Sequence, residues 1–157
     1  MRLTLDTNVL VSAFVSRDGN PARIVDLVLA FPEIKLVLSE SILQEFRDVM
    51  LRKEVRERFE YSSRGIDAFV QDLRHVSTII MVKSRFMVVK EDPKDNVVMN
   101  TAVDGKVDFV VSGDSHLQKL TKFRNVRIVS PKQMLRIITD RFGEIITYSD
   151  ELRKASA

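Results

Sequence analysis

Residues 2–14 read RLTLDTNVLVSAF, and this stretch decides the fold. Its first half alternates polar and apolar side chains, which is typical of a short β-strand, and the strand ends at Asp6. The residues from Thr7 to Phe14 are suited to open a helix directly after it. The stretch therefore predicts a strand followed by a helix, with an acidic side chain at the carboxyl end of the strand.

The same alternation continues along the chain. Patterns typical of strands recur at 34–38, 77–82 with 86–89, 108–111 and 126–129, and helical patterns occupy 20–31, 39–55, 66–75, 92–104, 116–120 and 130–141. Strands separated by helices predict an α/β fold with a parallel sheet covered on both faces. We expect one domain over residues 1–142 and a C-terminal extension over 143–157, in which the segment GEIITY can add an edge strand.

Composition excludes several classes of function. The chain has 157 residues, 25 basic and 22 acidic side chains, a net charge of +3 and no cysteine. Without cysteine there are no disulfides, no cysteine-bound zinc or iron–sulfur clusters and no thiol catalysis. No signal-peptide core and no run of about 18 apolar residues is visible, so we expect a soluble, cytoplasmic protein.

Two aspartates follow predicted strands. Asp6 ends the first strand, and Asp114 follows the strand over 108–111. In doubly wound sheets, functional groups gather beyond the carboxyl ends of the strands. Each aspartate can also serve simply as the N-cap of the helix that follows it. Their positions alone leave both roles open.

Two further acids lie on helices that are expected to face the core. Glu45 lies at the edge of an apolar stripe that includes Ile42 and Val49, where a carboxylate is costly unless it meets a cation or hydrogen bonds. Asp95 shares a helical face with Val98 and Ala102, although it is also suited to stabilise the first turn of its helix. Glu45 can alternatively flank the stripe and reach water.

Four carboxylates brought together would repel one another, so their convergence implies bound cations. Carboxylate oxygens suit Mg²⁺ or Mn²⁺, and the chain offers no cysteine or paired histidines for zinc. One such ion, or two about 4 Å apart, would activate water and stabilise a leaving oxygen in phosphodiester hydrolysis.

The sequence resembles the PIN-domain family, in particular VapC-type toxins of toxin–antitoxin pairs. The resemblance covers about residues 2–138 and is carried, in order, by LDTNVLVSAF, SESILQEF, DPKDNVVMNTAVDGKVDFVVSGDSHLQKL and VRIVSPKQML. It implies a three-layer α/β/α sandwich with a central parallel sheet, Mg²⁺- or Mn²⁺-dependent cleavage of single-stranded RNA, and a small antitoxin as partner. The site residues it implies are the four acids already singled out, Asp6, Glu45, Asp95 and Asp114, as catalytic residues and metal ligands, with Asn8, Ser112 and Asp92 as secondary members.

RNA binding requires cations near this acidic site, because phosphate contacts dominate affinity. The candidates lie in two basic runs and include Arg52, Lys53, Lys119 and Lys122, although such runs are also typical of a solvated surface. The resemblance also implies a homodimer or a higher oligomer. Two other functions remain open: a PIN-like module that binds RNA or protein without cutting, and an Mg²⁺-dependent phosphatase. The phosphatase is disfavoured because position 8 is Asn rather than a second Asp.

Overall fold

The computed structural model describes residues 1–90 and 93–156, with the backbone alone described for residues 94, 145, 148–150, 152 and 153. Its centre is a six-stranded sheet, in which every neighbouring pair is parallel except the last. The strand order is β3 (Thr78–Ile80), β2 (Lys35–Ser39), β1 (Arg2–Leu5), β4 (Phe109–Val111), β6 (Val126–Val129) and β5 (Lys122–Phe123).

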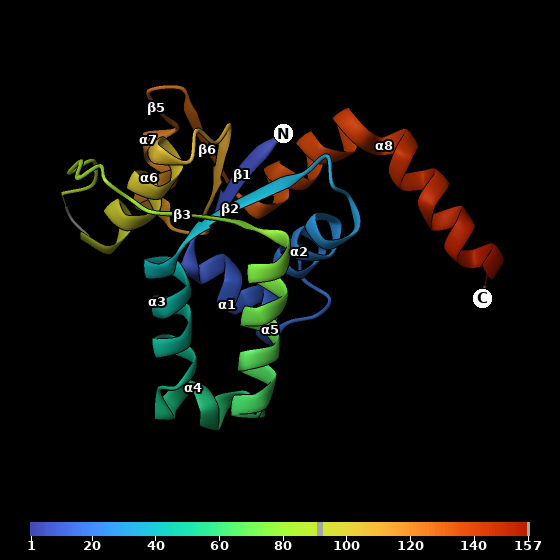
Figure 1. Cartoon of the computed structure of the whole chain (residues 1–157), viewed down its shortest axis with the longest axis horizontal. Coiled ribbons are helices and arrows are strands. Elements are labelled where there is room, and N and C mark those ends of the chain that lie inside the picture. The colour runs from blue at the N-terminus through green and yellow to red at the C-terminus, as the bar shows by residue number, and fades with distance from the viewer. Residues whose placement is uncertain (91–92, 157) are drawn as a thin grey trace.

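Helices cover both faces of this sheet. Figure 1 shows α6 and α7 on one side of the strands and α2 and α8 on the other. The helices are α1 (Thr7–Val15), α2 (Asn20–Ala30), α3 (Glu40–Met50), α4 (Lys53–Arg58), α5 (Ser63–Val76), α6 (Pro93–Asp104), α7 (Ser115–Leu120) and α8 (Pro131–Ser156). The predicted α/β/α sandwich with a mostly parallel sheet is confirmed.

The central strands are buried on both faces, as a parallel sheet between two helical layers requires. In β1, Leu3 and Leu5 are fully buried, and Thr4 between them is buried as well. The Thr4 hydroxyl donates to the carbonyl of Val37, 2.6 Å away, so this polar group keeps a hydrogen bond inside the core. The strand that precedes Asp6 is therefore held rigidly on either side.

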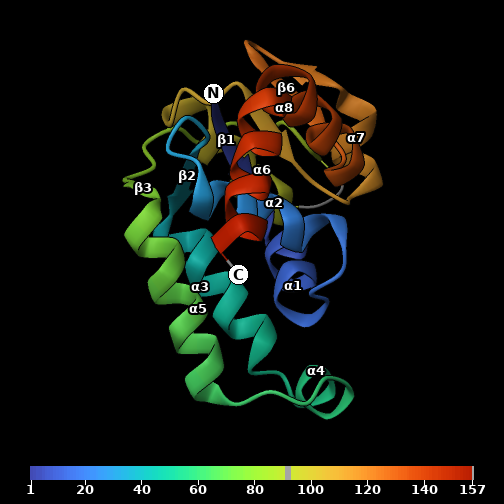
Figure 2. The same cartoon turned by 90° about the vertical axis from the view of Figure 1, so that its right-hand side faces the viewer.

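Helices α3 and α5 run side by side away from the sheet, and α4 joins them at their far end (Figure 2). Phe46 of α3 is fully buried, with ring centroids 6.0 Å from Phe14 of α1 and 5.3 Å from Phe69 of α5. Phe14 also lies 5.4 Å from Tyr61. These edge and tilted contacts join α1, α3 and α5 into one unit.

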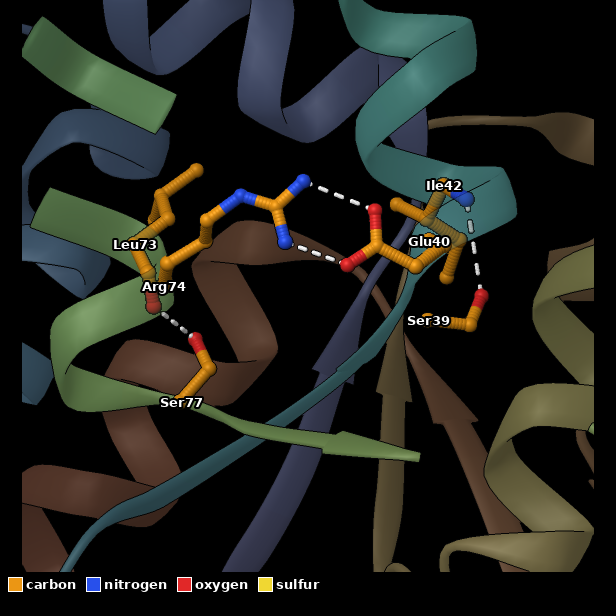
Figure 3. Close-up of polar contacts among 6 residues, drawn as sticks. All are labelled: Ser39, Glu40, Ile42, Leu73, Arg74 and Ser77. Atoms are coloured by element: carbon orange, nitrogen blue, oxygen red, sulfur yellow. Dashed lines mark hydrogen bonds and ion pairs between the residues drawn. The ribbon is translucent and has the colours of Figure 1, made fainter. Parts of the chain in front are cut away.

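A charged pair closes the end of this unit nearest the sheet. Figure 3 shows the Arg74 guanidinium of α5 facing the Glu40 carboxylate of α3, with two hydrogen bonds, one of them 2.7 Å long. The same view shows Ser39 capping α3 at the amide of Ile42, and the Ser77 hydroxyl donating to the Leu73 carbonyl at the end of α5. The bidentate pair holds the pKa of Glu40 below its usual value.

We expect Arg74→Gln to lower the free energy of unfolding by less than about 1 kcal/mol, because both side chains are substantially exposed to water and salt. Urea unfolding of Arg74→Gln, Glu40→Gln and the double variant measures the coupling between the two residues. We expect added salt to reduce that coupling. A loss of more than about 2 kcal/mol would instead show that the pair determines how α3 and α5 pack.

The helix predicted over residues 39–55 is wrong in its length. Helix α3 ends at Met50, and α4 begins at Lys53 after Arg52 adopts an extended conformation (φ −62°, ψ 136°). The hydroxyl of Tyr61 donates to the Met50 carbonyl at 2.6 Å, so a residue beyond α4 satisfies the end of α3. The local sequence carries no glycine or proline that would have signalled this break.

The strand predicted over 77–82 and 86–89 is also wrong in part, since only 78–80 pair with the sheet. Residues 81–89 are instead an extended strap against α6. The amides of Ser84, Phe86 and Val89 donate to Asp104, Asn100 and Asn96 of that helix, each at 2.8 Å. Side chains of a helix thus take the place of a neighbouring strand.

The edge strand predicted in GEIITY is wrong, because α8 continues through this segment to Ser156. Met134, Ile138, Phe142 and Ile146 recur every four residues on the side of α8 that packs against the core. The Thr147 hydroxyl donates to the carbonyl of Gly143 at 2.8 Å, which is compatible with a helix. The helix spans the predicted boundary between 142 and 143, and that boundary stays a prediction.

Two smaller features complete the fold. The two-residue strand β5, which pairs antiparallel with β6, was not predicted from the sequence. Within the described ranges, no helix combines the length and the apolar character needed to cross a membrane.

Candidate active site

Asp6 lies where β1 ends and α1 begins, and its side chain is 7% exposed. One carboxylate oxygen accepts from the amide of Thr7 at 2.8 Å, which makes Asp6 the N-cap of α1. The other accepts from the Ser112 hydroxyl at 2.7 Å and from the Asn8 amide at 3.1 Å. Capping and clustering with polar partners are therefore not alternatives for this residue, because it does both.

The loop after β4 brings the second aspartate to the same place. Leu5 of β1 pairs with Val111 of β4, so the residues that follow these two strands are neighbours. The Ser112 hydroxyl, which is fully buried, accepts from the amide of Asp114 at 3.0 Å while it donates to Asp6. Asp114 in turn caps α7 by accepting from the amides of His116 and Leu117.

Asn8 ties the two loops together from the solvent side. Its side-chain amide donates to Asp6, and its carbonyl oxygen accepts from the backbone amide of Gly113 at 3.1 Å. A Cβ added at Gly113 would lie 3.4 Å from that same oxygen, so a side chain at this position would crowd the bond. Asn8 and Ser112, both predicted as secondary residues, thus hold the Asp6 and Asp114 loops in register.

Asp6, Asp114 and Glu45 form an acidic cluster, which Glu45 reaches from the middle of α3. It is half-buried, and its Oε2 accepts a hydrogen bond from the Thr7 hydroxyl at 2.9 Å. Thr7 therefore connects Glu45 to Asp6, whose carboxylate accepts from the amide of the same threonine. We did not predict a role for Thr7, although its position directly after Asp6 was the available signal.

Asp95 lies in the first turn of α6 and is 6% exposed. Helix α6 packs against β1, β2 and β4, and it ends at Asp104, shortly before β4 begins. The helix must therefore run back along the strands, which places its first turn toward their carboxyl ends. Asp95 is thus at the same end of the sheet as Asp6 and Ser112, whereas Asp92 lies outside the described residues.

The surroundings of Asp6 disfavour its negatively charged form. Burial raises the pKa of the Asp6 carboxyl, and the Glu45 and Asp114 carboxylates raise it further. Hydrogen bonds from Ser112 and from the Thr7 amide act in the opposite direction but do not cancel the rise. A cation beside Asp6 would relieve both the repulsion and the cost of burying its charge.

The donors present fit a hard divalent cation, because carboxylate oxygens dominate the cluster and the chain lacks cysteine. Among the described residues, however, no three acidic or histidine side chains are placed to hold one ion. Hydrogen bonds from the protein engage the carboxylates instead, as the contacts of Asp6, Glu45 and Asp114 show. The donor atoms of the site therefore suit a hard divalent cation.

The predicted RNA-binding residues fall into two separate regions. Arg52 is the N-cap of α4, and Lys53 pairs with Glu57 at 3.8 Å, at the end of α3 remote from the sheet. Lys119 and Lys122 lie on α7 and β5, shortly after Asp114. The second pair thus follows Asp114 closely along the chain, whereas the first lies at the far end of α3.

The PIN domain family model matches residues 2–116, which is more than half of the chain. The chain belongs to the PIN-domain family. The match includes all four predicted acids. PIN domains are generally nucleases that use divalent metal ions, so this membership supports a hydrolase that acts on phosphodiester bonds.

Two individual proteins resemble this PIN-domain chain. "Uncharacterized protein MJ1680" of Methanocaldococcus jannaschii is 30% identical over 145 residues, which are 86% of this chain and 90% of the relative. A chain in the crystal structure of VapBC2 from Rickettsia felis, bound to a DNA fragment from their promoter, superposes with a TM-score of 0.56 at 13% identity. That match covers 83% of this chain and 98% of the other, and it shows the shared fold.

Proposed function

We propose that this PIN-domain protein is a divalent-metal-dependent endoribonuclease that cleaves single-stranded RNA. The observation that carries the proposal is the buried Asp6 carboxylate, which Glu45 and Asp114 repel while Ser112 and Asn8 fix its position. A cluster that repels its own charges at the carboxyl ends of parallel strands is suited to hold cations and to meet a substrate rich in phosphates.

We assign Asp6, Asp95 and Asp114 as the residues that would hold Mg²⁺ or Mn²⁺, with Glu45 completing the set. A bound divalent ion supplies a more acidic water and stabilises charge on the leaving oxygen of a phosphodiester. The protein's own contribution is orientation. Thr7 directs Glu45, and Ser112 and Asn8 direct Asp6, because each donates a hydrogen bond to the carboxylate that it positions.

Incubation of the purified protein with mixed single-stranded RNA tests the activity. We expect cleavage with Mg²⁺ or Mn²⁺, loss of cleavage with excess EDTA, and recovery when the metal is returned. Cleavage that EDTA leaves unchanged would contradict the metal dependence. RNA binding without cleavage under any of these metals would favour the non-cutting module, and hydrolysis of para-nitrophenyl phosphate alone would favour a phosphatase.

We also propose that the protein acts in the cytoplasm as the toxin of a toxin–antitoxin pair, and that it forms a homodimer or a higher oligomer. The resemblance to VapC-type toxins and the fold shared with a chain of VapBC2 support this. A gene for a small protein directly beside this one is the simplest observation in its favour. Co-expression of the two products should then suppress the RNA cleavage of this chain.

A further inference from the structure

A groove of about 810 Å³ lies at the β5 edge of the sheet, between α7 and α8. Its floor is formed by β6, including the buried Ile128 and Val129, and its walls combine Ile137 with polar and charged side chains. Its size is in the range of sites that enclose a ligand of several hundred daltons. Its polar lining includes Gln118, Lys122, Arg127, Gln133, Arg136 and Asp140.

The charge of this groove is positive. Lys122, Arg127 and Arg136 are exposed, and Asp140 is the acidic residue that lines the groove with them. The ion pairs found within the described part of the chain do not include any of these three cations. Their charges therefore remain open to an anion from outside.

The α7 side of the groove is hydrogen-bonded to the loop that positions Asp6. The side-chain amide of Gln118 donates to the Ser112 carbonyl at 2.8 Å, and the Ser112 hydroxyl donates to Asp6 at 2.7 Å. Another side of the groove is α8, on which Gln133, Arg136 and Asp140 succeed one another at about one turn each. The three cations thus lie on β5, β6 and α8, around a groove whose α7 side is hydrogen-bonded to the loop that holds Ser112.

We propose that the α7–α8 groove binds the ribose–phosphate backbone of single-stranded RNA on one side of the cleaved bond. This inference rests on the proposed nuclease function, and it selects the basic run near Asp114 over the run on α4. Lys122 and Arg136 would contact phosphates directly. Arg127, whose guanidinium lies 5.5 Å from the centroid of the Phe109 ring, is held in place by stacking while its N–H groups remain available.

RNA binding in EDTA tests the groove independently of cleavage. The groove variant is Lys122→Gln with Arg136→Gln, and the matched control is Arg23→Gln with Arg64→Gln, which removes the same charge from exposed positions on α2 and α5. Fluorescence anisotropy of a labelled pool of mixed-sequence single-stranded oligoribonucleotides reports affinity. Circular dichroism melting verifies that both variants are folded.

At about 50 mM salt we expect the groove variant to bind the pool at least about 10-fold more weakly and the control less than about 2-fold more weakly. The slope of log affinity against log salt should fall by about 1.4, because each phosphate contact on a single strand contributes about 0.7. Equal losses in the two variants, or no loss in either, would overturn the proposal. Groove-dependent binding of oligoglutamate in place of RNA would overturn it in favour of an acidic protein segment.

The outcomes also separate this inference from the proposed function. Groove-dependent binding of RNA by a wild-type protein that never cleaves it would leave the groove standing and remove the nuclease. Metal-dependent cleavage with unchanged RNA affinity in the groove variant would do the reverse.

Discussion

Asp6→Asn should reduce metal-dependent RNA cleavage by at least about 100-fold, because changes to groups that merely orient metal ligands already cost roughly 10–100-fold. The substitution is nearly isosteric, but it replaces one acceptor oxygen with an N–H₂ group. The oxygen that accepts from the Thr7 amide can be kept, while the donors Ser112 and Asn8 lose the carboxylate that they orient. The negative charge that we propose to attract a cation is lost at the same time.

A loss of cleavage in Asp6→Asn reports on the site only when the variant is still folded. Burial and two neighbouring carboxylates disfavour the charge of Asp6, which offsets the loss of an acceptor for Ser112 and Asn8, so we expect the variant to remain folded. Titration calorimetry with Mn²⁺ should show weaker binding than in the wild type. Asp18→Asn, at an exposed position, is the matched control and should retain both cleavage and Mn²⁺ binding. Full activity in Asp6→Asn would show that the site assignment is wrong.

Phe46→Ala should lower the free energy of unfolding by about 3–5 kcal/mol, the usual cost of removing a fully buried aromatic side chain. The ring is inaccessible to solvent and contacts Phe14 of α1 and Phe69 of α5, so both helices lose their aromatic partner on α3 at once. Small domains are stable by only about 5–15 kcal/mol, and the variant should therefore unfold at a much lower urea concentration.

Phe46→Leu is the control for this change, because it retains most of the apolar volume and should cost clearly less. Cleavage should also fall in Phe46→Ala near its unfolding transition, because Phe46 is the neighbour of Glu45 on α3. A loss below about 1 kcal/mol would mean that the aromatic cluster collapses around the cavity without penalty, contrary to the usual behaviour of packed cores.

The proximity of Asp6 to the Ser112 loop is predictable because it depends on the topology of the sheet. Strands that end at Asp6 and just before Ser112 must bring these residues together once the sheet is parallel. Glu45 was found through its place at the edge of an apolar stripe, and the structure shows it half-buried against Thr7. The assignment of these residues as catalytic groups and metal ligands stays a prediction.

What the sequence could not supply were interactions between distant segments. Alternation over 81–89 predicts a strand. The backbone of this segment instead donates to side chains on α6, and no local sequence pattern indicates that partner. Gly143 and the β-branched residues after it favour a strand, whereas the apolar spacing from Met134 to Ile146 places this segment in a helix. In each case the longer-range packing outweighed the local propensity.

The strap over residues 81–89 constrains the chain in a further way. From Ser84 to Phe86 an extended backbone advances about 6.6 Å, and from Asp104 to Asn100 a helix advances about 6 Å. The two advances nearly match, so the amides of Ser84 and Phe86 both meet their acceptors on successive turns of α6. An insertion or deletion between Ser84 and Phe86 would shift the later amides away from their acceptors on α6. It would also turn the exposed Met87 toward the helix. This stretch can therefore vary in sequence during evolution far more readily than it can vary in length.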